Sequence, residues 1–258
     1  MKNLYILEHA AECERLNQQS EIEQFSIADE LKKIKFPEVG NVLDAGCGSG
    51  LAARYIKEVF PTLEVEACDS SEARIADAMA EKSEIYYYHA DISELDKLGK
   101  FYDLILNRYV AHHLNGKLYQ KCLHAFYDSL NVQGQVIIID ADGALINIGT
   151  TNKKLIKYLD KIKKHFPGDL QQARKIPSML KSAGFKDIKY DIEVMNFQGS
   201  NRIKEIQQYE QRLEFSKDMY IFILGNKSEY LNFKELYLNE IKDSPLFYNK
   251  FIINAHKF

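Results

Sequence analysis

The chain has 258 residues, a formal net charge of -3, and 46% hydrophobic residues. This length and composition suffice for one large α/β domain with its own core, and the small net charge gives no overall electrostatic reason to expect nucleic-acid binding. No C-x-x-C pair occurs among the four cysteines, which speaks against a disulfide framework or a zinc site and favours a cytoplasmic protein.

The N-terminal sequence MKNLYILEHAAECERLNQQ carries charges at Glu8, Glu12, Glu14 and Arg15. A secretory signal needs an uninterrupted apolar stretch, so none is expected here. No run in the chain reaches the ~18 apolar residues that a membrane-spanning helix needs. We therefore expect no membrane span.

Short apolar runs alternate with helical periods from residue 41 to about residue 140. The runs end in polar residues and predict strands over 41–45, 64–69, 84–91, 102–107 and 135–140. Such alternation is typical of βαβ units, which form a mostly parallel sheet with helices on both faces. Ligands of these sheets bind at the carboxyl ends of the strands.

The regular alternation stops after Asp140. The later patterns predict helices over 151–166 and 171–184, a strand over 186–197, helical stretches over about 201–224 and 228–242, and a strand over 248–258. Seven strands are thus available. The extra helices, at about 145–170 and 198–245, are expected to be insertions that form a lid over a substrate cavity.

The first of these helices is basic. Its apolar positions are Leu155, Ile156, Leu159, Ile162 and Phe166, so its lysines are expected to form a solvated face, with anionic substrates, RNA and a membrane surface as alternatives. These lysines are Lys153, Lys154, Lys157, Lys161, Lys163 and Lys164.

A glycine-rich loop, VLDAGCGSG, occupies residues 42–50 between the first strand and a helix. A ligand is expected to meet backbone N–H groups at that helix N-terminus. A dinucleotide fingerprint beginning at Gly46 would need glycine where Leu51 stands, and no Walker lysine follows the loop. The spacing therefore disfavours a phosphate ligand.

Acidic residues follow three successive predicted strands. Asp44 would repel pyrophosphate but suits an ammonium or sulfonium centre. Asp69 can accept hydrogen bonds from both hydroxyls of a ribose. Asp91 can accept from an adenine amino group while Ile92 covers the ring. The set indicates an adenosine with a positively charged tail; helix capping is the alternative role for Asp69 and Asp91.

The loop D-A-G-C-G-S-G, with Asp69-Ser70 and Ala90-Asp91-Ile92 in order behind it, resembles the class I S-adenosylmethionine-dependent methyltransferases. The resemblance is firm over about 40–140 and looser over 171–197 and the final strand. It implies an α/β, Rossmann-like fold: a seven-stranded, mostly parallel sheet in the order 3-2-1-4-5-7-6 with the last strand antiparallel. It also implies S-adenosylmethionine as cofactor and S-adenosylhomocysteine as product.

The same resemblance assigns parts of the cofactor to residues. Gly46 and Gly48 would lie against the methionine part, Asp69 at the ribose, and Asn107 near the methyl group. Cys47 is expected to be a small loop residue of doubtful reactivity. The cofactor-binding residues expected in this region are Asp44, Gly46, Cys47, Gly48, Asp69, Ser70, Asp91, Ile92 and Asn107.

The segment NRYVAHHL (107–114) stands where the family keeps its acceptor-side residues. It departs from the N-P-P-Y type, which makes an amide or base-amino acceptor improbable, and resembles the looser segment of enzymes that methylate small metabolites. Tyr109, His112 and His113 are the catalytic candidates, since a histidine can serve as general base. The alternative is that these side chains only pack in the protein interior. We expect no metal, because adjacent helical residues diverge and no carboxylate stands at ligand spacing.

The N-terminal YILEHAAECERLNQQSE resembles a leader helix of some bacterial small-molecule methyltransferases, which packs over the cofactor. The resemblance divides the chain into an N-terminal helical cap (1–30) and a methyltransferase domain (31–258). Tyr5, Arg15 and Gln19 would contact the methionine end, and Arg15 would pair with its carboxylate in bidentate fashion. An exposed arginine is the alternative.

These patterns together predict an S-adenosylmethionine-dependent methyltransferase acting on a small organic acceptor through oxygen, nitrogen or carbon, in that order of preference. The aromatic residues of the insertions weakly favour an aromatic or lipid-like acceptor. An RNA or protein methyltransferase and a non-catalytic cofactor-binding protein are the alternatives. The acceptor and the oligomeric state stay open.

Overall fold

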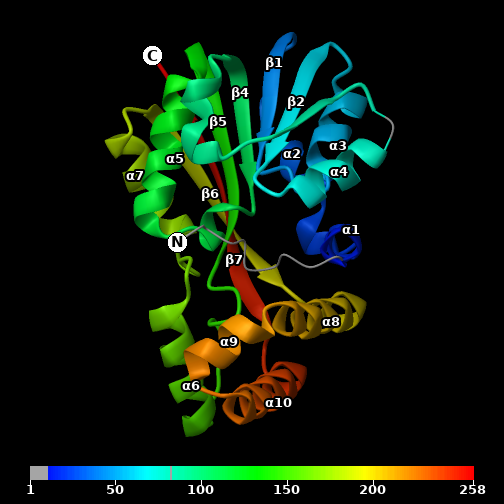
Figure 1. Cartoon of the computed structure of the whole chain (residues 1–258), viewed down its shortest axis with the longest axis vertical. Coiled ribbons are helices and arrows are strands. Elements are labelled where there is room, and N and C mark those ends of the chain that lie inside the picture. Colours follow the sequence, from blue (N-terminus) through cyan, green and yellow to red (C-terminus); the bar gives the residue numbers. More distant parts are fainter. Residues whose placement is uncertain (1–10, 82) are drawn as a thin grey trace.

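The computed structural model describes residues 11–81 and 83–258. A seven-stranded sheet fills the upper part of the view in Figure 1, and most of the later helices gather below it. The strands are β1 (Gly40–Ala45), β2 (Leu63–Asp69), β3 (Tyr86–His89), β4 (Tyr102–Arg108), β5 (Leu130–Asp142), β6 (Lys186–Asn196) and β7 (Phe247–His256).

The strand order is β3-β2-β1-β4-β5-β7-β6. Strands β1 to β5 pair in parallel, and β7 runs antiparallel to both β5 and β6. The fold predicted from the sequence is confirmed in its strand number, order and direction.

The central strands are buried on both faces, as parallel strands between two helical layers must be. Successive residues alternate between two core clusters: Val42 and Leu104 belong to one, while Leu43 and Ile105 belong to the other. Alternate side chains of a strand point to opposite faces of the sheet. The side chains of each unbroken apolar run therefore pack alternately into the two core clusters.

Helices cover both faces of the sheet (Figure 1). Two of them, α3 (Leu51–Val59) and α4 (Glu72–Ala80), contribute to one core cluster, and α5 (Gly116–Asp128) and α7 (Ile176–Ser182) contribute to the other. Three short 3₁₀ segments accompany them: η2 (Ile92–Leu98), η3 (Ala111–His113) and η4 (Ala173–Lys175).

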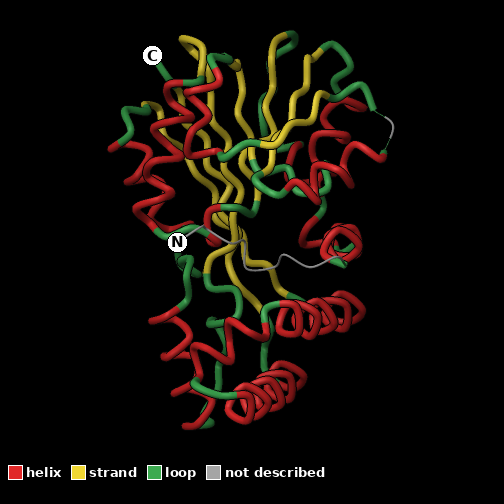
Figure 2. Tube along the Cα trace, viewed as in Figure 1, coloured by secondary structure: helices red, strands yellow, loops and turns green. Residues whose placement is uncertain are grey.

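A separate group of helices lies below the carboxyl ends of the parallel strands, as Figures 1 and 2 show. Their side chains form a third core cluster, which includes Tyr209, Phe233 and Tyr237. The helices are α6 (Lys153–His165), α8 (Gly199–Phe215), α9 (Lys217–Leu224) and α10 (Lys227–Asp243).

The prediction of one continuous helical stretch over 201–224 is wrong, because the chain leaves helical geometry at Ser216 (φ -103°, ψ 19°). The Ser216 hydroxyl donates to the carbonyl of Arg212, four residues earlier. A serine bonded back in this way competes with the helical hydrogen bonds and bends the chain. Two helices, α8 and α9, result.

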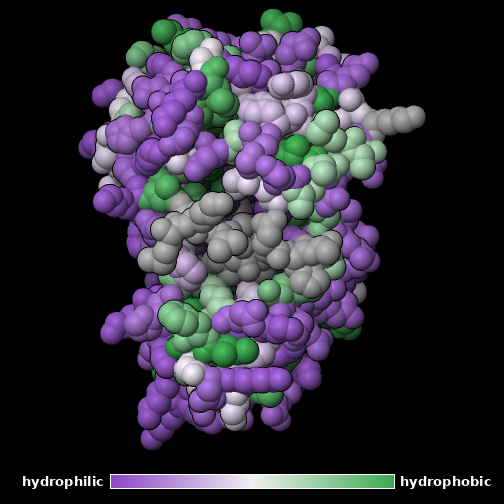
Figure 3. All heavy atoms as spheres, viewed as in Figure 1, coloured by the Kyte–Doolittle hydropathy of each residue, from purple (hydrophilic) through white to green (hydrophobic). Residues whose placement is uncertain are grey.

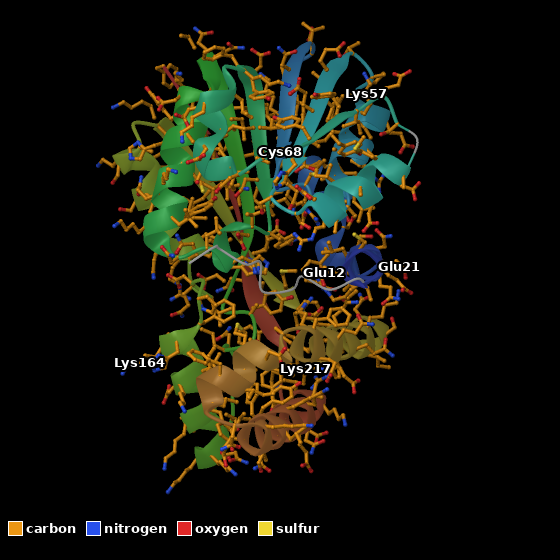
Figure 4. All side chains as sticks on the ribbon, in the orientation of Figure 1. Glu12, Glu21, Lys57, Cys68, Lys164 and Lys217 are labelled. Atoms are coloured by element: carbon orange, nitrogen blue, oxygen red, sulfur yellow. The ribbon has the colours of Figure 1, made fainter. Side chains whose placement is uncertain are left out.

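The basic face of α6 is exposed, as expected: all six of its lysines are solvent-accessible, and Lys164 points away from the molecule in Figure 4. Ile156 was assigned to the apolar face, but it is 39% exposed. Figure 3 also shows hydrophobic residues at the surface of α9, where Phe222 is 87% exposed.

The N-terminal segment bridges the two parts of the molecule. It contains α1 (Glu12–Ser20), η1 (Glu23–Phe25) and α2 (Ile27–Leu31). Figure 4 shows Glu12 and Glu21 at the level between the sheet and the lower helices, and Arg15 of α1 bonds to Gln208 of α8. Tyr5, predicted to contact the cofactor, lies outside the described residues.

Within the described ranges, no helix has both the length and the apolar character needed to cross a membrane. All four cysteines are free thiols.

Candidate functional site

A cavity of about 580 Å³ opens at the carboxyl ends of the parallel strands. We call it the strand-end cavity. All three acids that follow the first three strands line it, together with the glycine-rich loop. The predicted residues that line it are Asp44, Gly46, Cys47, Gly48, Asp69, Ser70, Asp91, Ile92, Gln19, Tyr109 and His113.

The glycine-rich loop folds back onto the end of β2. The N–H groups of Gly46 and Cys47 both donate to the carbonyl of Cys68, at 2.8 and 2.9 Å. Gly46 has φ +84°, and a Cβ there would lie 2.6 Å from a methyl carbon of Val110. Glycine is required at this position both by the backbone conformation and by the space. These two N–H groups are bonded inside the protein.

Asp44 is buried at the N-terminus of α3. It is 1% exposed, and its carboxylate accepts the N–H of Ala53, in the first turn of α3, at 3.2 Å. Burial raises the pKa of Asp44 to about 7. A carboxylate already occupies this helix N-terminus, so the site favours a cationic ligand over a phosphate.

Asp69 ends β2 and organises the loop. One carboxylate oxygen accepts the N–H of Gly48, and the other accepts the N–H of Ser71, both at 2.9 Å. Arg74 lies 3.4 Å from the second oxygen. A carboxylate offers about four acceptor positions, so Asp69 keeps capacity for hydroxyl donors in the cavity.

Asp91 caps η2 by accepting the N–H of Ser93 at 2.8 Å, which is the capping role considered from the sequence. Its side chain also stays exposed to the strand-end cavity, beside the buried Ile92. Capping and ligand contact are therefore compatible here. Cys47 lines the same cavity, and burial followed by the charges of Asp44 and Asp69 raises its thiol pKa, so it stays protonated.

A second cavity, of about 130 Å³, lies between the sheet edge and helices α8 and α9. We call it the helix-side cavity. The two cavities adjoin, because five residues line both of them. These shared residues are Leu16, Gln19, Phe25, Tyr109 and His113.

His112 lines the helix-side cavity and is paired with a buried carboxylate behind it. The Nδ1 atom of His112 lies 2.5 Å from a carboxylate oxygen of Asp140, and its backbone N–H donates to the other oxygen at 3.2 Å. Asp140 is fully buried at the end of β5. The pair has the arrangement of a general base oriented by an acid.

His113 sits beside this pair in η3, and its ring centroid is 3.9 Å from that of His112. The expectation that the two rings diverge is wrong, because the tight 3₁₀ turn keeps them together. Burial, and then the neighbouring His112, lowers the pKa of His113 well below its usual value. His113 is therefore neutral. Among the described residues, no group of three or more potential ligands surrounds a metal position.

Tyr109 stands at the junction of the cavities in a left-handed conformation, with φ 55°. Its hydroxyl donates to Glu30 at 2.7 Å, and the guanidinium of Arg108 and the amine of Lys250 bind the same carboxylate at 2.6 and 2.9 Å. Burial raises the pKa of Glu30, but Arg108 and Lys250 outweigh it and hold that pKa below its usual range. This buried network fixes Tyr109 in place.

Arg15 lies at the helix-side cavity and not at the strand-end cavity. Its guanidinium pairs in bidentate fashion with Glu12, at 2.8 and 2.6 Å, and also donates to Gln19 and Gln208. The alternative of an exposed arginine is wrong, since Arg15 is 3% exposed. The carboxylate that Arg15 binds in this structure is that of Glu12, and its pairing with the methionine end of the cofactor stays a prediction.

Asn107 does not line either cavity. Its side-chain N–H donates to the carbonyl of Ala45 at 2.6 Å, and its oxygen accepts the hydroxyl of Tyr119 at 2.8 Å. The side chain is fully buried and ties β4 to β1. The structure thus places Asn107 behind the site.

Sequence reasoning missed Glu30, Asp140 and Arg212 as site residues. Asp140 had the same signal as the other three acids, since it follows an apolar strand. Glu30 had none, because its partner Arg108 is 78 residues away along the chain. Arg212 lines the helix-side cavity from α8, within an insertion that the sequence treated only as a lid.

The chain was compared with known proteins. A family model described as a methyltransferase domain matches residues 19–190. The trans-aconitate 2-methyltransferase of Variovorax paradoxus is 32% identical over 75 residues, which are 29% of this chain and 29% of that protein.

Solved structures share the fold. Phosphoethanolamine N-methyltransferase 2 of Haemonchus contortus, in complex with S-adenosyl-L-methionine, has a TM-score of 0.56 and 22% identity; the match covers 90% of this chain and 52% of that one. A putative methyltransferase of Haloferax volcanii, in complex with the activator Trm112, has a TM-score of 0.59 and 12% identity, with 96% of both chains covered.

The family model spans most of the chain, and the strand order agrees with the order expected for that family. The family and the cofactor type inferred from the sequence are confirmed. The chain belongs to the class I S-adenosylmethionine-dependent methyltransferase family.

Proposed function

We propose that this protein transfers a methyl group from S-adenosylmethionine to a small organic acceptor, with oxygen preferred over nitrogen and nitrogen over carbon. One observation carries the proposal: an acid-lined cavity at the strand ends adjoins a smaller cavity lined by His112, which is paired with the buried Asp140. The first suits the cofactor and the second suits the acceptor.

The residues of the strand-end cavity fit S-adenosylmethionine. Asp44 offers a buried carboxylate to a cationic tail, Asp69 keeps acceptor capacity for ribose hydroxyls, and Asp91 with Ile92 provides an acceptor beside an apolar surface. The cofactor, when bound, supplies a methyl group already activated by a sulfonium. Gly46, Cys47, Gly48, Ser70 and Gln19 complete the wall in this proposal.

His112 is the proposed general base. With an oxygen acceptor, His112 would take the hydroxyl proton as the oxygen takes up the methyl group that the cofactor would supply, with the neutral thioether as the leaving group. Asp140 stabilises the imidazolium that results. Tyr109 and His113 line the junction, where they position the acceptor and exclude water.

The size of the helix-side cavity supports a small acceptor, because about 130 Å³ between the sheet edge and two helices has room for a compact group. Two of the compared proteins are also named for small acceptors, trans-aconitate and phosphoethanolamine. In this proposal residues 1–30 are a cap, and the helices at about 145–170 and 198–245 enclose the acceptor. A cytoplasmic location, which the four free thiols suit, completes it.

The test combines binding with transfer. Calorimetric titration with S-adenosylhomocysteine should show binding that Asp69→Ala weakens at least tenfold, or about 1.4 kcal/mol. S-adenosylmethionine with a labelled methyl group is then incubated with a cell extract split by ultrafiltration. Label in the small-molecule fraction supports the proposal. Label only in protein or RNA, or binding without any transfer, would overturn it.

A further inference from the structure

The two cavities differ in the charges of their walls. The strand-end cavity has Asp44, Asp69 and Asp91 in its wall, besides two arginines. Among the described residues that line the helix-side cavity, by contrast, there is no aspartate or glutamate, and the charged residues are Arg15 and Arg212. The acids that pair with these arginines, Glu12 and Glu205, do not line the cavity.

The guanidinium of Arg212 is fixed by an ion pair and an aromatic contact. Its Nη1 atom donates to Glu205 at 2.8 Å, and the hydroxyl of Tyr248 donates to the same oxygen of Glu205 at 3.0 Å. The ring of Tyr209 lies against the guanidinium, with 5.0 Å between the guanidinium carbon and the ring centroid. Glu205 is fully buried, whereas the Arg212 side chain is 19% exposed. The acid thus lies behind the arginine, and the accessible part of the arginine lines the cavity.

A guanidinium carries five N–H donors in a planar fork. The bond to Glu205 occupies one side of that fork, and Tyr209 and Glu205 restrict its rotation. A fork fixed in this way at a cavity wall matches the two oxygens of a carboxylate.

We propose that the methyl acceptor carries a carboxylate and that Arg212 binds it; this inference rests on the proposed methyl transfer. Arg212 lines only the helix-side cavity and not its junction with the strand-end cavity. The carboxylate it holds is therefore a specificity group, separate from the atom that receives the methyl group beside Tyr109 and His113.

The surroundings favour a carboxylate over a phosphate. Each arginine is already neutralised by one glutamate, so the site offers oriented donors without the excess positive charge that a dianion needs. The rest of the wall is largely apolar and aromatic, and includes Leu145, Phe166 and Tyr220. It suits an acceptor with a compact apolar body and one carboxylate.

The first experiment divides the small-molecule fraction of a cell extract on an anion exchanger and assays each part for methyl acceptance, before and after phosphatase treatment. We expect the acceptor to be retained by the exchanger and to survive phosphatase. An acceptor in the unretained fraction, or one destroyed by phosphatase, overturns the carboxylate assignment. Absence of transfer from every fraction contradicts the methyl-transfer proposal itself, and this inference with it.

The second experiment tests Arg212 with the acceptor so identified and with its carboxamide. Arg212→Gln should raise the KM for the acid by a factor of roughly 10 to 100, the size of a charged hydrogen bond, and leave kcat and the KM for the carboxamide nearly unchanged. Lys204→Gln is the matched control, because Lys204 is an exposed cation on the same helix, and it should change neither value.

Arg212→Gln alone leaves Glu205 buried without its cation, which can prevent folding. The double variant Arg212→Gln with Glu205→Gln removes both charges and keeps a hydrogen-bonding side chain at each position. It should bind S-adenosylhomocysteine as the wild type does and still show the raised KM for the acid. An unchanged KM in the folded double variant would refute the role of Arg212.

Discussion

At the scale of single residues, the site contains buried carboxylates that differ in their hydrogen-bond and ion-pair partners. Asp140 faces a histidine and Glu30 faces two cations, whereas Asp44 accepts one backbone N–H. Burial without a full partner opposes ionisation, and a cationic partner favours it. The pKa of Asp44 is accordingly raised and that of Glu30 is lowered.

Asp44 should couple cofactor binding to proton release. Burial raises its pKa from 3.8 to about 7, so the folded protein binds more protons than the unfolded chain across that interval. Its contribution to the free energy of unfolding therefore falls as pH rises from about 4 to 7. A cationic ligand favours the carboxylate, so binding of S-adenosylmethionine near pH 7 should release a fraction of a proton. Affinity should rise with pH through the same range.

Calorimetry in two buffers of different ionisation enthalpy measures this release. Asp44→Asn should abolish it, and the wild type should lose it well above pH 7, where Asp44 is already ionised. Equal proton release by the variant would assign the titration to another group.

His112 should matter for turnover and not for cofactor binding. His112→Gln removes the proposed base and should lower kcat by roughly 10²- to 10⁴-fold, while the affinity for S-adenosylhomocysteine stays the same. Asp140→Asn should lower kcat less, because it removes only the partner that orients the ring. Steady-state kinetics beside calorimetry separate the two effects. A kcat within a few-fold of the wild type would show that positioning alone drives the transfer.

At the scale of elements, the loop before η4 supports η3, which carries the proposed base His112. The N–H of Asp169 donates to the carbonyl of His112 at 3.0 Å, and a Cβ at Gly168 would lie 2.2 Å from that carbonyl oxygen. Backbone atoms cannot swing away as a flexible side chain can. The segment that follows α6 is therefore fitted against η3, which carries both histidines.

Gly168→Ala should displace η3 and lower kcat. Binding of S-adenosylhomocysteine should change little, because Asp44 and Asp69 lie on β1 and β2 and Asp91 precedes η2. The control is Gly149→Ala in the same insertion, since a Cβ at Gly149 meets nothing within 4 Å. Kinetics and calorimetry on both variants provide the measurement. Equal kcat values for the two variants would contradict this support.

At the scale of the whole molecule, the sheet has two core clusters and the lower helices have a third. The proposed cofactor residues lie at the carboxyl ends of the strands, whereas Arg212 and Tyr209 of the helix-side cavity belong to α8. Stability of the lower core should therefore control acceptor use more than cofactor binding.

Phe233 is fully buried in the lower core, and Phe233→Ala should cost ~3–5 kcal/mol of stability in those helices. Hydrogen exchange should increase in α6, α8, α9 and α10 while the sheet stays protected, and turnover should fall before cofactor affinity does. Phe222→Ala is the control, because Phe222 is 87% exposed and should change stability by about 0.5 kcal/mol or less. Uniform loss of protection across the sheet and the helices would show a single cooperative unit.

The sequence by itself determined the seven-stranded fold, the family and the acids at the ends of β1, β2 and β3, because alternating apolar runs and glycine spacing are written in contiguous residues. Only the tertiary structure decided which charges meet. Glu30 reaches Arg108, and His112 reaches Asp140. These pairs join residues 78 and 28 positions apart, and packing between elements selects such partners, which no local pattern records. The same holds for Arg212, whose place in the wall of the helix-side cavity depends on how α8 packs below the sheet.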